Sequence, residues 1–81
     1  MKNITDLLIN QPGYVSDILV DGLLKERLLA LGLTKGTFLL PIRKGPRNNL
    51  TVYLIRGVMI ALRVEEAKLI TIKEDDIVGA Y

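Results

Sequence analysis

The sequence contains no cysteine and no histidine. Without cysteine the chain has no disulfide bonds and no thiolate metal sites, which suits a reducing cytoplasm. Without histidine it lacks the side chain that most often serves as a general base or metal ligand near neutral pH. Tight capture of a transition metal by imidazole or thiolate ligands is therefore excluded, and no cofactor is expected.

Aromatic residues and long apolar runs are also scarce. The chain has three Tyr, one Phe and no Trp, although 49% of its residues are hydrophobic, so its core must be aliphatic. The longest unbroken apolar runs are about five or six residues, whereas a membrane-spanning helix needs about 20. The first residues, Met1 to Asp6, lack the apolar region of a signal peptide. We therefore expect a cytoplasmic protein that is not itself embedded in a membrane.

The length and charge of the chain set further bounds. Eighty-one residues predict one domain spanning residues 1–81, with residues 74–81 as a C-terminal extension. The formal net charge of +2 permits contact with an acidic surface, but it does not by itself indicate nucleic-acid binding.

One helix is predicted, from about Leu23 to Leu31. Leu24, Leu28 and Leu31 fall at positions i, i+4 and i+7, which places them on one helical face. Asp21 is a candidate N-cap that would accept hydrogen bonds from backbone N–H groups of the first turn.

Glycines mark the end of this helix and the turns that follow. Gly32 occupies the position at which a helix ends in a left-handed residue, and this would bring Leu33 against Leu28 in a Schellman ending. Gly36 allows a second sharp turn before a β-rich run. Further on, Arg56-Gly57 is a two-residue connection typical of a tight hairpin.

Five segments have strand-like composition. They are Tyr14–Val20, Thr37–Arg43, Leu50–Ile55, Val58–Arg63 and Leu69–Lys73. Val64–Lys68 reads as one helical turn. Short strands with glycine-rich turns at close spacing predict a mainly β fold, a small closed or half-closed barrel of about five strands with one short α-helix and one short helical turn.

The periodicity of each element also predicts its buried face. Ten residues share the phase assigned to the core: Leu28, Leu31, Phe38, Leu40, Val52, Leu54, Ile60, Leu62, Ile70 and Ile72.

A basic cluster follows the second predicted strand. Pro41 cannot donate a ladder hydrogen bond, so it belongs at a sheet edge or a bulge. Arg43, Lys44 and Arg47 lie just beyond it, on a loop rich in Gly, Pro and Asn. Ordinary solubilising charge is the default interpretation of these three side chains. If the cluster is functional, the Pro41–Asn49 region would contact an acidic protein surface, because the aromatic residues typical of nucleic-acid sites are missing from it.

Two groups of acidic residues are candidate sites of chemistry. Glu65 and Glu66 are adjacent and diverge on a helix, so they cannot share one substrate, and a capping role is favoured. Residues 74–76, Glu-Asp-Asp, could hold a hard cation through oxygen ligands, although consecutive residues of an extended chain face alternately and favour a solvated tail.

Residues 27–36, Arg-Leu-Leu-Ala-Leu-Gly-Leu-Thr-Lys-Gly, resemble the RL-x-x-LGL-x-x-G signature of FeoA-type ferrous iron transport proteins. Arg56-Gly57 followed by residues 61–67, Ala-Leu-Arg-Val-Glu-Glu-Ala, is similar to the RG…LR-x-x-EA element of that family, and Pro12-Gly13 matches a dipeptide before its first strand. The resemblance covers roughly residues 4–73. It implies an SH3-like barrel in the cytoplasm that assists a membrane ferrous-iron transporter carrying a GTPase domain.

Three classes of function follow. The first is a non-enzymatic accessory protein of ferrous iron uptake, without nucleic-acid binding and peripheral to the membrane through its partner. The second is a nucleic-acid-associated or metal-dependent-repressor-type module with the same fold. An enzyme comes last, because no nucleophile–base pair, metal cluster or phosphate-binding loop is visible. Self-association through a strand edge or the tail stays open.

Overall fold

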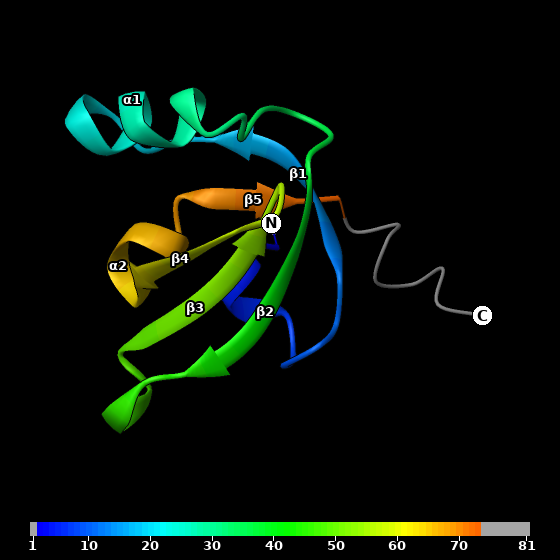
Figure 1. The fold of residues 1–81 in the computed structure, drawn as a ribbon, viewed down its shortest axis with the longest axis vertical. Coiled ribbons are helices and arrows are strands. Elements are labelled where there is room, and N and C mark those ends of the chain that lie inside the picture. The colour runs from blue at the N-terminus through cyan, green and yellow to red at the C-terminus, as the bar shows by residue number, and fades with distance from the viewer. Residues whose placement is uncertain (1, 74–81) are drawn as a thin grey trace.

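The computed structural model describes residues 2–73. Five antiparallel strands form one curled sheet in the order β4-β3-β2-β1-β5 (Figure 1). The strands are β1 (Gly13–Ile18), β2 (Phe38–Lys44), β3 (Leu50–Ile55), β4 (Val58–Arg63) and β5 (Ile70–Ile72). The helical elements are the 3₁₀ turn η1 (Ile4–Asp6), α1 (Gly22–Ala30), the 3₁₀ turn η2 (Pro46–Asn48) and the single turn α2 (Val64–Ala67).

The mainly β class and the predicted order of elements are confirmed. The sheet is not closed: within residues 2–73, no strand pairing joins β4 to β5. α2 connects these two edge strands, and η1 contacts both α2 and β5. The barrel is therefore half-closed, with short helical elements at its opening (Figure 1).

The C-terminus of α1 has the hydrogen bonds of a Schellman ending. The N–H of Gly32 donates to the Leu29 carbonyl at 2.9 Å, and the N–H of Leu33 donates to the Leu28 carbonyl at 2.9 Å. Gly32 has a φ of +92°, the left-handed conformation in which a Cβ would be strained. Leu28 and Leu33 are both buried, so the chain turns from the helix directly into the core.

Two further turns direct the strands. The N–H of Thr37 donates to the Thr34 carbonyl at 3.0 Å, and Gly36 inside this turn has a φ of +88°. Between β3 and β4, Arg56 and Gly57 have φ values of +50° and +82°. Positive φ at both central residues is the type I′ geometry that matches the twist of a hairpin.

The start of α1 differs from expectation in one respect. Asp21 takes the N-cap position with an extended backbone, but its side chain makes no capping hydrogen bond. The first helical residue, Gly22, has a φ of +68°. The first turn therefore lacks the regular geometry in which a capping carboxylate reaches the N–H groups of the second and third residues.

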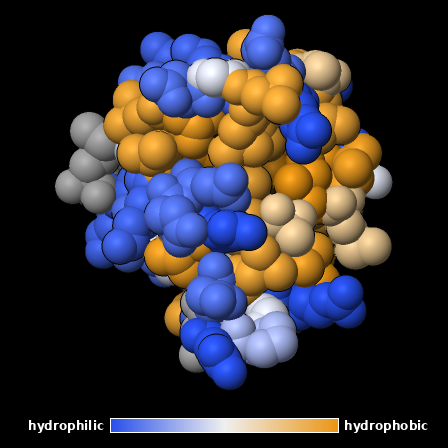
Figure 2. All heavy atoms as spheres, turned by 90° about the vertical axis from the view of Figure 1, so that its left-hand side faces the viewer, coloured by the Kyte–Doolittle hydropathy of each residue, from blue (hydrophilic) through white to orange (hydrophobic). Residues whose placement is uncertain are grey.

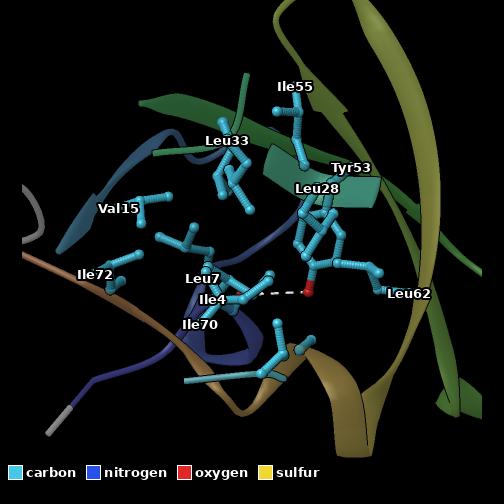
Figure 3. Close-up of a cluster of buried hydrophobic side chains, with 13 residues drawn as sticks. Ile4, Leu7, Val15, Leu28, Leu33, Tyr53, Ile55, Leu62, Ile70 and Ile72 are labelled. Atoms are coloured by element: carbon cyan, nitrogen blue, oxygen red, sulfur yellow. Dashed lines mark hydrogen bonds between the residues drawn. The ribbon is translucent and has the colours of Figure 1, made fainter. Parts of the chain in front are cut away.

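The core lies between the curled sheet, α1 and the N-terminal segment (Figure 3). Its side chains come from every strand and from both ends of the described chain: Ile4, Leu7, Val15, Val20, Leu28, Leu33, Leu39, Tyr53, Ile55, Leu62, Ala67, Ile70 and Ile72. Burial of Ile4 and Leu7 fixes the N-terminal segment against the sheet.

The predicted phase was right for α1, β4 and β5 and wrong for β2 and β3. Leu28, Leu62, Ile70 and Ile72 are buried as predicted, but Phe38 is 45% exposed. In β2 and β3 the inward positions are the alternate set: Leu39, Pro41, Thr51, Tyr53 and Ile55.

The reason for this error is that both faces of these two strands are apolar. The pairs Leu40–Leu54 and Leu54–Met59 run across the outer face, where Leu40 and Leu54 are half-buried. Alternation identifies the buried face only when one face is polar. Here Tyr53 and Thr51 point inward, whereas the aliphatic residues Val52 and Leu54 point outward. This is the opposite of the usual arrangement, in which the more polar residues of a strand face solvent.

Candidate protein-binding site

The connection between β2 and β3 carries the basic cluster. The Gly45 N–H donates to the Leu50 carbonyl at 2.7 Å and closes the loop, in which η2 begins at Pro46. Arg47 has a φ of +63°, an uncommon conformation for a residue other than glycine. The connection forms the group of polar atoms at the bottom of the view in Figure 2. The loop projects from the end of the sheet, and Arg47 on it is exposed.

Strand register sends Arg43 and Lys44 to different faces. Arg43 lies opposite Val52, and Lys44 lies opposite Thr51. Directly opposite residues share a face of the sheet, so Arg43 is on the outer face and Lys44 is on the inner face beside buried Thr51. Both side chains are exposed. The two cations therefore flank the end of the sheet.

A fourth cation, Arg63, joins this group through the β3–β4 register. Arg63 lies opposite Leu50, the residue that closes the β2–β3 loop, and it is exposed. Reasoning from the sequence missed Arg63 because it belongs to another strand. Counting the hairpin register back from Arg56-Gly57 would have found it. We refer to Arg43, Lys44, Arg47 and Arg63 as the basic end of the sheet.

No ion pair within residues 2–73 involves the basic end. The one ion pair in this part of the chain joins Lys35 Nζ to Asp17 Oδ1 at 4.0 Å, outside the basic end. Two acidic side chains are engaged with backbone groups instead: the Asn3 N–H donates to Asp6 Oδ2 at 3.0 Å, and the Arg63 N–H donates to Glu66 Oε1 at 2.9 Å. The latter bond is the capping role expected of the Glu65–Glu66 pair.

Lys44 also lines a cavity of about 190 Å³ at this end of the barrel. The cavity is bounded by Thr5, Leu7, Lys44, Thr51, Tyr53, Leu62, Val64 and Ala67. The Tyr53 hydroxyl donates to the Ile4 carbonyl at 3.5 Å (Figure 3). Burial raises the pKa of Tyr53, and a side-chain hydrogen bond with Thr51 opposes this rise. The phenol is therefore neutral at physiological pH and serves the packing of the core.

The structure places Pro41 in the core and not at a sheet edge. β2 lies between β1 and β3, and the Pro41 side chain is fully buried. The strand register with β3 shifts between Pro41 and Arg43, so of the two positions expected for this proline the bulge is the observed one. Its carbonyl accepts a hydrogen bond from the Asn10 N–H at 2.8 Å. Pro41 therefore sets the course of the strand toward Arg43, and its side chain is not available to a partner.

Within residues 2–73, no group of three His, Cys, Asp or Glu side chains could hold a metal ion. The acidic residues 74–76, which the sequence offers as a candidate cation site, lie outside the described residues. No helix in the described part of the chain is long and apolar enough to cross a membrane.

A family comparison gives a clear result. The model of the FeoA domain matches residues 2–74, nearly the whole chain. No curated protein matches this chain.

Three solved structures of FeoA or iron(II) transport proteins have the same fold as this chain. The FeoA protein from Chlorobium tepidum is 24% identical with a TM-score of 0.80, and the match covers 86% of this chain and 67% of that one. Iron(II) transport protein A from Clostridium thermocellum is 27% identical with a TM-score of 0.78 over 88% of this chain. The match covers only 44% of the C. thermocellum chain, so this chain spans less than half of it.

The third structure is FeoA from Stenotrophomonas maltophilia, complexed with zinc. It is 21% identical with a TM-score of 0.80, and the match covers 94% of each chain. It is described as a procaryotic SH3 domain protein and as a candidate activating factor of bacterial ferrous iron transport. The fold of the present chain is accordingly the SH3-like fold.

Proposed function

Since this chain belongs to the FeoA family, we propose that it is a non-enzymatic accessory protein of bacterial ferrous iron uptake. Its partner is the cytoplasmic, GTPase-containing part of the ferrous iron transporter. The protein acts in the cytoplasm, at the inner face of the membrane through this partner. Iron is the cargo of the transporter and is not held by the accessory protein.

The observation that carries the proposal is the basic end of the sheet. Its four cations come from β2, from the β2–β3 loop and from β4, all four are exposed, and none forms an ion pair within residues 2–73. Unpaired cations at the rim of an interface attract an acidic partner, and they act mainly on association rate and salt dependence. An acidic surface on the transporter domain is the complementary feature.

Pro41 contributes to this contact through its position. The bulge between Pro41 and Arg43 determines where β2 leaves the sheet and hence where Arg43 and Lys44 emerge. The docking contact consists of Arg43, Lys44 and Arg47 together with Arg63, and Pro41 is their support.

Nucleic-acid binding is the competing function, and the composition of the basic end argues against it. Residues 41–50, which carry three of its four cations, include no aromatic side chain on which a base could stack. A repressor-type module would show binding to duplex DNA that falls steeply with rising salt.

The test uses the purified chain and the cytoplasmic domain of the transporter. Arg43→Glu, Lys44→Glu and Arg47→Glu are combined in one variant, and binding is measured by biolayer interferometry at several salt concentrations. We expect a lower association rate and weaker binding at low salt, with the far-UV spectrum and melting temperature unchanged. Arg63→Glu, as a single change, should weaken binding in the same direction.

A matched control reverses three charges elsewhere. Lys25→Glu, Arg27→Glu and Lys68→Glu change the net charge by the same amount, and all three residues are exposed. Loss of binding in this control with normal binding in the first variant would move the docking face to the exposed side of α1, near Lys25 and Ala30. Normal binding in both variants would refute an electrostatic contact.

A further inference from the structure

One edge strand of the sheet is covered by the N-terminal segment and the other is not. The free edge of β5 is covered by the N-terminal segment: the Ile72 N–H donates to the Lys2 carbonyl at 3.1 Å, and Asn3 forms a bridge with Thr71. β4 is the other edge, and among residues 2–73 it pairs with β3 alone. Hence β4 is the edge to which another strand can be added.

The hairpin register shows which backbone groups of β4 face outward. Ile55 and Val58 flank a two-residue turn, and such a pair is hydrogen-bonded. Hydrogen-bonded pairs alternate, so Met59 and Ala61 direct their N–H and C=O groups away from β3. Arg63 follows the same alternation as Met59 and Ala61: its N–H points away from β3 and donates to Glu66.

The edge carries few of the features that normally block strand addition. β4 contains no proline, its register with β3 has no shift, and its first five residues are uncharged. Met59 is 67% exposed and Ala61 is exposed, on the same outer face as Leu54 and Val52. A strand added here would find apolar neighbours at Met59 and Ala61 and the cationic side chain of Arg63, whose backbone N–H is already bonded to the Glu66 carboxylate.

The charge distribution along the chain identifies an occupant. Residues 1–73 contain eleven Lys and Arg against six Asp and Glu, a formal net charge of +5, whereas residues 74–76 contribute −3. The sequence of residues 74–81 is Glu-Asp-Asp-Ile-Val-Gly-Ala-Tyr, an acidic start followed by apolar residues. An acidic residue, followed by apolar residues two and four positions later, complements Arg63, Ala61 and Met59 in antiparallel order.

We propose that the free edge of β4 receives residues 74–81 of a second copy of this chain as an added antiparallel strand. In this register Asp76 faces Arg63, Val78 faces Ala61 and Ala80 faces Met59. The donor is a second copy because the described chain ends beside β1, where the Lys73 N–H donates to the Tyr14 carbonyl. Residue 73 follows β5, and β5 and β4 are the two opposite edge strands of the sheet. This self-association does not require the transporter.

The test follows the full ¹⁵N-labelled chain by sedimentation equilibrium and by amide chemical shifts as its concentration is raised. We expect concentration-dependent association, with shifts largest at Met59, Ala61 and Arg63. A synthetic peptide of residues 74–81 should produce the same shifts and compete with association. No association, or shifts that do not depend on protein concentration, would overturn the proposal, the latter because it would place the segment on its own chain.

Charge-swapped variants identify the two contacting parts. Arg63→Glu and the double variant Asp75→Lys, Asp76→Lys should each associate several-fold more weakly than the unmodified chain. An equimolar mixture of the two should recover association, because the reversed edge then meets a reversed segment. Recovery would not occur if two β4 edges paired directly, and that result would refute the assigned occupant.

A backbone pair controls for effects on folding. Ala61→Pro removes the outward N–H, whereas Ala61→Val keeps it and favours a strand. We expect association to be lost in the proline variant and retained in the valine variant, with similar far-UV spectra. Equal association of the two variants would also contradict strand addition.

Discussion

The side chain of Arg56 lies directly over Gly32. A Cβ placed on Gly32 would come within 2.5 Å of Arg56 Cδ and 2.6 Å of Arg56 Nε. Gly32 ends α1, and Arg56 lies in the turn between β3 and β4, so the two segments with family-like sequence meet at this contact. Glycine therefore suits residue 32 for two reasons. It adopts the left-handed backbone without strain, and it leaves room for the side chain of Arg56.

Gly32→Ala should lower the free energy of unfolding by about 1 kcal/mol or more, because a Cβ is strained at a φ of +92°. Arg56 is exposed and its side chain can move, so its displacement should add only a small amount to this cost. Urea unfolding followed by far-UV circular dichroism measures the change. An unchanged midpoint would show that the turn tolerates a side chain.

Gly36→Ala is the matched control for this substitution. Gly36 has a similar φ of +88°, but nothing lies within 4 Å of a Cβ placed on it. Gly36→Ala should lower the free energy of unfolding through backbone strain alone. The difference in unfolding free energy between the two variants therefore measures the effect of the contact with Arg56. Adding Arg56→Ala should relieve part of the cost at residue 32 and none at residue 36, a coupling that a double-mutant cycle detects.

Neighbouring leucines in β2 should differ sharply in their contribution to stability. Leu39 is fully buried, so Leu39→Ala should cost about 2–5 kcal/mol through lost burial and the cavity it leaves. Leu40 is half-buried on the outer face, so Leu40→Ala should cost less than half as much. Chemical denaturation of the two variants side by side gives the comparison. A larger loss at Leu40 would contradict the observed strand phase.

The stability of the protein should fall at alkaline pH in a way that depends on Tyr53. Burial raises the pKa of Tyr53 above 10.0 in the folded chain, so the folded state favours the neutral phenol. The resulting stabilisation is fully present below the pKa of the unfolded state and is lost as pH rises through the folded-state pKa. Tyr53→Phe should be less sensitive to pH above about 10. Unfolding at several pH values, with absorbance at 295 nm reporting ionisation, tests this prediction.

The isolated chain should not bind Fe²⁺ tightly. It has neither histidine nor cysteine, and carboxylates alone hold this ion weakly. Anaerobic titration calorimetry should give no stoichiometric binding in the micromolar range. Sub-micromolar binding at a fixed stoichiometry would assign the protein a direct role in holding the cargo.

Local sequence was sufficient wherever one residue decides the backbone conformation. Gly32, Gly36 and Gly57 mark turns because positive φ is strained for residues with a Cβ. Arg56-Gly57 likewise fixes the register of β3 and β4, since a two-residue hairpin leaves no freedom in pairing. The order of the elements and the mainly β class follow from these turns and the composition of the segments between them.

The tertiary structure alone decided which face of β2 and β3 is buried. Both faces of these strands are apolar, so alternation of Leu39 with Leu40 or of Tyr53 with Leu54 carries no information about direction. The choice depends on the direction in which the sheet curls, which places Leu39, Tyr53 and Ile55 in the core. Arg63 lies at the same end of the sheet as Arg43, Lys44 and Arg47. The β3–β4 part of this placement follows from the Arg56-Gly57 turn, whereas the β2–β3 part includes the register shift after Pro41, which the sequence alone does not locate.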